Sequence, residues 1–210
     1  MRPVFFHPEI RVPDASEVPA PAGGPAARAS RRCGAAAGYP PLYYATAAAG
    51  YRLVRGGPLL QRLLAARLVS VLWGAAGAAA AFLLGLWTLG DARGGLAVGL
   101  AYALQPMQAL LFSQVSNDAA LLASSTAAFA AAAALRAHPG SRGPWVGLAA
   151  SSVAGALSKP TFLLVLPGLA FAVAAALGRD RLRPRAGLVL LPALAAGLAW
   201  EVLGSGPPGT

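Results

Sequence analysis

The residues best suited to chemistry in this chain are a carboxylate and a lysine, each at the edge of an apolar stretch. Asp118 follows Asn117 where one stretch begins, and Lys159, the single lysine, precedes a proline inside another. A positioned carboxylate can take a proton from a hydroxyl, and a fixed cation can stabilise a departing phosphate. These residues are therefore candidates for a site in which Asp118 is the catalytic group and Asn117 and Lys159 are substrate contacts.

Each of these residues also has a simpler structural explanation. Asn and Asp at the start of a helix are good N-caps, and an acidic residue there is favoured by the helix dipole. A lysine near the membrane surface can extend its ammonium group to the lipid head groups, whereas ionisable residues at greater depth are costly and usually functional. The sequence leaves both explanations open for Asp118 and for Lys159.

Aromatic and basic residues upstream form a second set of candidates for substrate binding. Tyr43 and Tyr44 are suited to stack on a sugar, and Arg52 and Arg55 are suited to hold a pyrophosphate. The alternatives are an aromatic belt at head-group depth for the tyrosines and contact with anionic lipid for the arginines. Spacing alone does not decide between them.

The elements that must position these residues are membrane helices. The chain of 210 residues is 57% hydrophobic and only 11% charged, and its mean hydropathy is +0.59. A spanning helix needs roughly 20 apolar residues, and residues 68–89 supply such a run without a charged side chain. Lipid is therefore the solvent for most of this chain.

We expect an all-α polytopic transmembrane bundle with about five to six membrane segments. Residues 1–38 predict an irregular loop rich in Pro, Ala, Gly and Arg, and residues 39–67 predict a helical segment at the interface. Residues 68–203 form the transmembrane domain, and residues 204–210 are a loop or a truncated end. The expected spans are 68–89, 96–112, 119–135, two pieces within 145–177, and 186–200.

Local features refine this arrangement. Pro106, between Gln105 and Gln108, predicts a kink in the second span, and the spacing of Gly95 and Gly99 predicts close helix packing. The piece before Lys159 is short for a full crossing. Either both pieces of 145–177 span the membrane, or they form a re-entrant hairpin with Lys159 near its tip.

Several function classes are disfavoured by the composition. The net charge of +10 comes with no recognisable nucleic-acid module, so we expect membrane lipid and no nucleic acid as a partner. The single cysteine, Cys33, excludes an intrachain disulfide, and two histidines argue against a zinc or di-iron site. We expect neither a metal nor a cofactor.

The distribution of arginine gives conflicting signals about sidedness. An even number of expected crossings separates the loops 136–144 and 178–185, so both loops lie on the same side of the membrane. Together they carry six arginines, and the positive-inside rule therefore places them in the cytoplasm. Nine arginines precede the first span, so a raw count favours the opposite orientation. Long loops are translocated largely regardless of charge. We therefore expect residues 1–67, Asn117, Asp118 and, if both pieces of 145–177 span the membrane, Lys159 on the outer side.

Five short patterns along the chain resemble an uncharacterised family of bacterial predicted integral membrane proteins. The patterns are Tyr39–Tyr44, Arg67–Ser70, Gln105–Met107, Val115–Asp118 and Leu157–Pro160. That family is similar to the GT-C glycosyltransferases, which use polyprenyl-phosphate-linked sugars outside the cytoplasmic membrane. The resemblance covers roughly residues 39–200.

The resemblance implies a multi-pass protein of the bacterial cell membrane that takes a polyprenyl-phosphate-sugar donor and a glycan or another cell-envelope acceptor. It also implies a catalytic carboxylate in a long first external loop and a His-Pro-Pro-Leu-Tyr-like segment. Here Tyr39 replaces the histidine, and the acidic pair expected after a first helix has no clear match. We therefore expect a fragment that lacks the first transmembrane helix and the C-terminal part, and it stays open whether this chain is an enzyme.

Two other classes of function compete with the glycosyltransferase hypothesis. A transporter or flippase subunit is favoured by broken helices with polar residues near the middle of the membrane. A structural membrane protein without catalysis needs no reactive residues at all.

Overall fold

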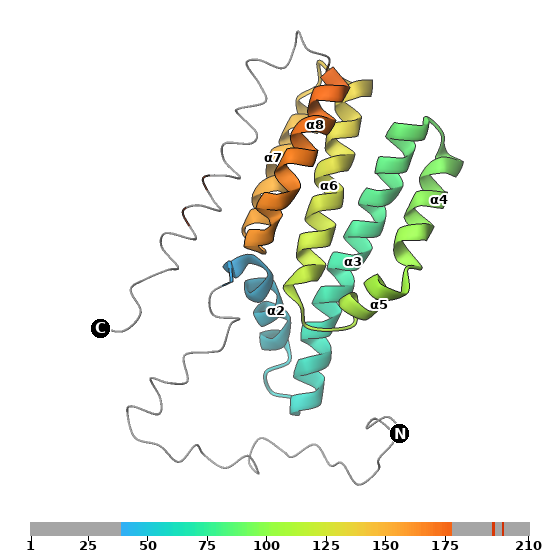
Figure 1. Cartoon of the computed structure of the whole chain (residues 1–210). Coiled ribbons are helices and arrows are strands. Elements are labelled where there is room, and N and C mark those ends of the chain that lie inside the picture. The colour runs from blue at the N-terminus through green and yellow to red at the C-terminus, as the bar shows by residue number, and fades with distance from the viewer. Residues whose placement is uncertain (1–38, 178–194, 196–198, 200–210) are drawn as a thin grey trace, which may run out of the picture.

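The computed structural model of the chain describes residues 39–177 together with Ala195 and Ala199. All regular structure in this part is helical, and the helices run up and down as a bundle (Figure 1). In chain order they are α2 (Pro41–Leu53), α3 (Leu59–Leu89), α4 (Ala92–Ala103), α5 (Pro106–Phe112), α6 (Asn117–Ala137), α7 (Arg142–Ala156), the 3₁₀ helix η3 (Pro160–Val165) and α8 (Leu166–Leu177). The prediction of an all-α helical bundle is confirmed. The predictions for residues 1–38 and 204–210 and for the span at 186–200 lie outside the described residues.

Three helices of the described part are long and apolar enough to cross a membrane. They are α3, α6 and the continuous segment Pro160–Leu177, which comprises η3 and α8. The pair α4 and α5 adds a fourth as a broken span, bent by 64°. The bend lies at Gln105 and Pro106, because proline lacks an amide hydrogen and disfavours helical backbone in the residue before it. The predicted kink is confirmed.

The first long helix begins earlier than the sequence indicated. It starts at Leu59 rather than Leu68 and continues to Gly90, whose φ of +83° ends it in the left-handed conformation that glycine tolerates. The segment 39–67 therefore divides into α2 and the first turns of α3. Arg62 and Arg67 interrupt the apolar run but not the helix, since arginine is a good helix former.

Glycines allow α4 to pack directly against α3, as the spacing of Gly95 and Gly99 predicted. A Cβ atom added at Gly95 would lie 2.9 Å from the carbonyl oxygen of Phe82, and one at Gly99 would lie 3.2 Å from the Cβ atom of Phe82. On the α3 side, a Cβ atom at Gly85 would lie 2.9 Å from the carbonyl oxygen of Gly94. Both helices thus meet through small residues, as is common in membranes.

The second half of the bundle is a hairpin of α7 and α8 that lies along α6 (Figure 1). Its core contains Leu135 near the end of α6, Leu148 of α7 and Phe162 of η3, all fully buried. At the other end of α6, Lys159 contacts Asp118. The hairpin therefore runs along α6 from one end to the other, and of its two arms only Pro160–Leu177 is long and apolar enough to count as a span.

Helix α2 closes the bundle at the end where α6 begins. The amide of Leu42 donates a hydrogen bond to the carbonyl of Leu157, at 3.0 Å, which joins α2 to the end of α7. Tyr43 packs with Ala119 and Ala120 of α6 in a small buried cluster. Segments far apart in the sequence therefore meet at one end of the molecule.

Candidate functional site

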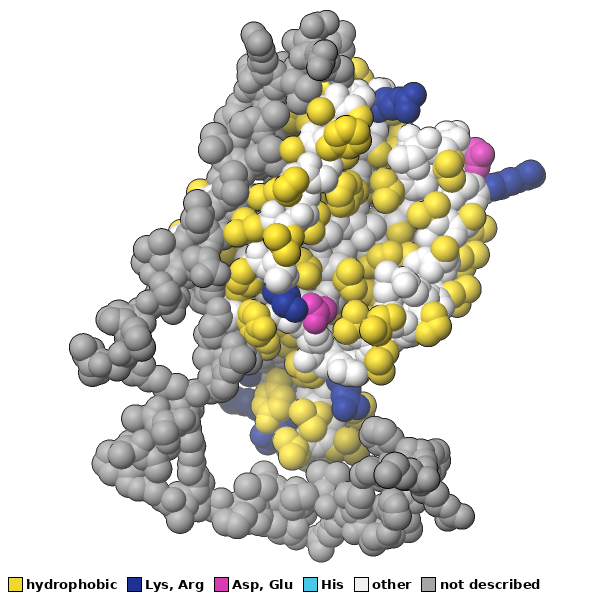
Figure 2. Space-filling view, in the orientation of Figure 1, with side chains coloured by type: hydrophobic (Ala, Val, Ile, Leu, Met, Phe, Trp, Pro, Cys, Tyr) yellow, Lys and Arg dark blue, Asp and Glu magenta, His cyan; other side chains and the backbone are white. Residues whose placement is uncertain are grey.

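The site is centred on an ion pair between two helix boundaries. Lys159 Nζ lies 2.6 Å from Asp118 Oδ1, and the side chains are 20% and 33% exposed, respectively. On the face that Figure 2 presents, an acidic and a basic side chain adjoin among apolar and uncharged atoms. Two charged groups held together and half-buried can both reach a ligand at the surface. The structure therefore brings together the two residues on which the predicted chemistry depends most.

Asp118 is fixed by the start of α6. Ser116 is the N-cap, and its hydroxyl oxygen accepts a hydrogen bond from the amide of Asp118 at 3.2 Å and lies 3.2 Å from Asp118 Oδ2, to which it donates. Neither Asn117 nor Asp118 is therefore the N-cap, which was the structural explanation that the sequence left open for them. Both residues lie inside the first turn, where the positive end of the helix dipole stabilises the Asp118 carboxylate.

Lys159 is fixed by the turn from α7 to η3. Ser158 before it is fully buried, and its hydroxyl donates to the carbonyl of Ala154 at 2.7 Å. Lys159 has extended backbone dihedrals, φ −159° and ψ 135°, as expected for a residue before proline. The buried ring of Phe162 packs against Gly155 of α7 and holds this turn in place.

Two tyrosines border the ion pair. The Tyr39 ring centroid lies 5.8 Å from Lys159 Nζ, within the range of a cation–π contact. Tyr44 is half-buried, and burial raises the pKa of its phenol, with the charges of Lys159 and Asp118 close enough to act on it. Sequence reasoning noted Tyr39 only as a substitution for histidine and did not predict its place beside the lysine.

Tyr43, in contrast, lies beneath the surface. It is fully buried, and its hydroxyl lies 2.7 Å from the hydroxyl of Ser70 on α3. Burial raises the pKa of this phenol. The structure places the Tyr43 side chain in the packing between α2, α3 and α6, with no surface offered to a substrate.

Asn117 is buried beside the catalytic candidate. The residue is 5% exposed, and its side-chain nitrogen has no hydrogen-bond partner within the described part of the chain. An unpaired buried donor costs about 1–3 kcal/mol. This amide would gain from any acceptor, such as water or a ligand oxygen, that reached it.

The two arginines of the predicted substrate set are not brought to the ion pair. Arg52 lies in the last turn of α2 and Arg55 just after it, both exposed. Among the described contacts, neither arginine forms a hydrogen bond or an ion pair with Asp118 or Lys159. Arg52 is placed to interact favourably with the C-terminal dipole of α2.

A family model described as predicted membrane protein (DUF2142) matches residues 13–206. The chain belongs to this family. No curated protein and no solved structure matches the chain.

Family membership and the helices of this DUF2142 chain agree on its class. With three helices able to span a membrane and a fourth, broken candidate, it is a multi-pass membrane protein. Within residues 39–177, His, Cys, Asp and Glu side chains form no group of three or more that would hold a metal ion. The chemistry available at the described site is that of a carboxylate, an ammonium group, an amide and phenols.

Proposed function

We propose that this DUF2142 protein is a GT-C-like glycosyltransferase that transfers a sugar from a polyprenyl-phosphate carrier to a glycan or another cell-envelope acceptor at the outer face of the bacterial cytoplasmic membrane. The observation that carries the proposal is the contact between Lys159 and Asp118. It unites a general base and a phosphate-binding cation at one end of a membrane bundle. Such a site would meet a substrate whose lipid chain lies in the bilayer and whose sugar phosphate lies at the surface.

In this mechanism Asp118 accepts the proton of the acceptor hydroxyl. The acceptor oxygen then forms a bond to the anomeric carbon as the bond from that carbon to the phosphate oxygen breaks. The electron pair of the broken bond leaves with the lipid phosphate. Its negative charge is stabilised by Lys159.

The hydrogen-bonding capacity of the site fits these roles. A lysine ammonium group has three donors, and the contact with Asp118 occupies one of them. The remaining donors are available to phosphate oxygens. Tyr44 and Tyr39 border the pair and supply faces on which a sugar can stack.

The test is transfer of labelled sugar from polyprenyl-phosphate sugars in membranes that contain the protein. We expect Asp118→Asn to reduce transfer by about 10²–10⁴-fold, the usual contribution of a general base. Asp91→Asn is the matched control, because Asp91 caps α4 at the opposite end of α3. Equal transfer by Asp118→Asn and Asp91→Asn would contradict the proposal.

A charge reversal separates catalysis from folding. The double variant Asp118→Lys/Lys159→Asp retains two opposite charges at the same positions but moves the carboxylate from the first turn of α6. We expect loss of transfer and a small loss of thermal stability, because a lysine in the first turn of α6 opposes the helix dipole. A double variant that transfers sugar as the parent does would assign the pair a purely structural role.

The broken span favours a transporter as the second candidate. Helices α4 and α5 meet at 64°, and Gln108 after the break has a buried side-chain oxygen without a partner among the described residues. Broken helices with free polar groups are typical of binding sites in transporters. Uptake or lipid flipping that survives Asp118→Asn and is lost in Gln108→Leu would favour this class over the transferase.

A further inference from the structure

A groove lies toward the end of the bundle opposite the ion pair. It has a volume of about 330 Å³, is open on one side and lies between α3, α6 and α8. Its floor and walls are mainly apolar, with Leu84, Phe129 and Ala175 among the lining residues, and Arg136 and Trp87 also line it. Along α6, Arg136 is eighteen residues from Asp118, a separation of about 27 Å. The groove is therefore distinct from the proposed transfer site.

The three helices that form the groove are the three that can each span a membrane. A hollow open between such helices faces lipid rather than water. If left empty, the hollow would deprive its walls of dispersion contacts. A hydrocarbon chain fills it without desolvating a polar group, so the apolar part of the ligand is an acyl chain.

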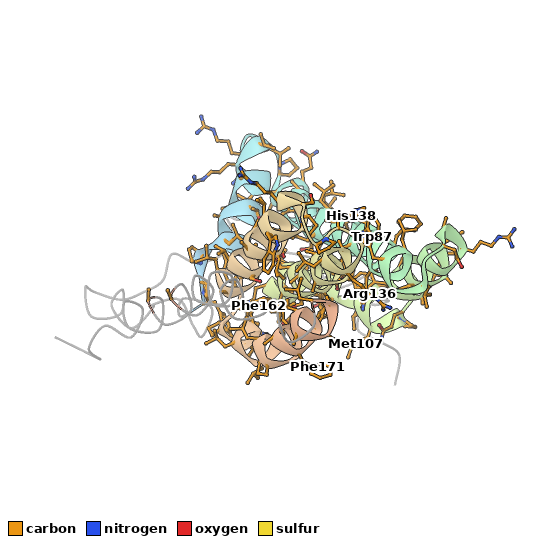
Figure 3. All side chains as sticks on the ribbon, turned by 90° about the horizontal axis from the view of Figure 1, so that it is seen from above. Trp87, Met107, Arg136, His138, Phe162 and Phe171 are labelled. Carbon is orange, nitrogen blue, oxygen red and sulfur yellow. The ribbon has the colours of Figure 1, made fainter. Side chains whose placement is uncertain are left out.

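The polar residues mark the end of the groove at the head-group level. Trp87 packs edge-on against His138, with ring centroids 5.0 Å apart. Figure 3 views the bundle from this end and shows both residues near Arg136. Tryptophan is enriched at the membrane interface. Arg136 is exposed beside the groove and has no acidic partner within the described residues. Its guanidinium group is therefore free to bind the oxygens of a phosphate in a bidentate manner.

From these observations we infer that the groove between α3, α6 and α8 binds an anionic phospholipid, with one acyl chain against Phe129 and Ala175 and the phosphate at Arg136. Charge complementarity favours an anionic over a zwitterionic lipid. The loops at this end are rich in arginine in the sequence, Arg136 and Arg142 among them, and basic segments attract anionic lipid.

Fluorescence quenching by brominated lipid tests the inference directly. The full chain, with Trp73, Trp145 and Trp200 replaced by phenylalanine, retains Trp87 as its only fluorescent indole. It is reconstituted into phosphatidylcholine vesicles that contain a minor fraction of either brominated phosphatidylglycerol or brominated phosphatidylcholine. We expect the anionic lipid to associate about fivefold more strongly, the effect of one basic residue near the head group.

Three variants define the site. Arg136→Gln should abolish the preference for phosphatidylglycerol, whereas Arg142→Gln, at an exposed position of the same end outside the groove, should retain it. Ala175→Phe fills the groove from an exposed position and should reduce quenching by both lipids. Equal quenching by the two lipids in the parent, equal loss in Arg136→Gln and Arg142→Gln, or unchanged quenching in Ala175→Phe would each overturn the inference.

Discussion

Lys159 and Asp118 meet because neighbouring residues fix the backbone on both sides of the contact. Ser116 sets the first turn of α6, and the buried Ser158 anchors the residue before Lys159. Held in this way, the pair loses little side-chain entropy on binding a substrate, which is the advantage of preorganised groups.

The buried hydroxyl pair of Tyr43 and Ser70 supports this end of the bundle from below. Removing one hydroxyl leaves the other buried with a lost partner, so Tyr43→Phe and Ser70→Ala should each lower the free energy of unfolding by about 1–3 kcal/mol. The free energy of unfolding of the double variant Tyr43→Phe/Ser70→Ala should fall by less than the sum of the two single losses. Thermal unfolding in detergent measures these values, and strictly additive losses would contradict a direct interaction.

The pH dependence of stability follows from the same phenol. Burial raises the pKa of Tyr43 above its usual value of 10.0, so the folded state favours the neutral hydroxyl. The contribution of the neutral Tyr43 phenol to the free energy of unfolding is therefore complete below about pH 10 and is lost as the pH rises further. Above that pH, the stability of Tyr43→Phe should fall less steeply than that of the parent, and identical slopes would contradict this assignment.

At the scale of the elements, the turn between α7 and η3 depends on one close contact. Gly155 packs against the ring of Phe162, and an added methyl group would collide with it. Gly155→Ala should therefore destabilise the fold by about 1–3 kcal/mol, as overpacking does. Gly155→Ala should also reduce sugar transfer, because Lys159 lies in the turn that the contact between Gly155 and Phe162 holds in place.

Gly147 provides the control on the same helix. A Cβ atom there would lie 3.6 Å from the Cβ atom of Ala131, an ordinary contact. Gly147→Ala should be neutral or stabilise by about 0.5–1 kcal/mol, because alanine is the better helix former. Equal melting temperatures for Gly155→Ala and Gly147→Ala would show that the Phe162 contact does not constrain the turn.

The sequence predicted several of these elements for clear physical reasons. Long runs without charge revealed the spans in α3 and α6, and Pro106 revealed the break between α4 and α5. The start of α3 at Leu59 was missed, because Arg62 and Arg67 interrupt the hydropathy pattern although they do not interrupt the helix. Hydropathy reports the solvent of a segment, whereas helix ends depend on local capping.

The candidate site was predicted only in its parts. Parity of the spans placed Asp118, Lys159 and Tyr43 on one side, but the rotation of each helix depends on packing contacts such as that of Gly155 with Phe162. Because of the rotation of each helix about its axis, Lys159 contacts Asp118, Tyr43 points into the bundle and Tyr39 lies beside the lysine. No spacing rule in the sequence encodes these three outcomes.

At the scale of the whole molecule, the bundle has two polar ends with different characters. One end carries the ion pair and the tyrosines, and the other carries Arg136, His138 and Arg142 around the start of α7. In the proposed orientation, the first end lies at the outer face, where it meets lipid-linked sugar, and the second lies at the cytoplasmic leaflet. The proposed function therefore depends on one orientation in the membrane.

The most direct measurement of that orientation is labelling of single cysteines by a membrane-impermeant thiol reagent. In a Cys33→Ser background, Gln114→Cys places a thiol at an exposed position just before α6, and Gly140→Cys places one at the opposite end, where a Cβ atom has open space. We predict that intact cells are labelled at position 114, whereas position 140 is labelled only after lysis. Labelling at position 140 in intact cells, with position 114 protected until lysis, would place the ion pair on the cytoplasmic side and contradict the proposed function.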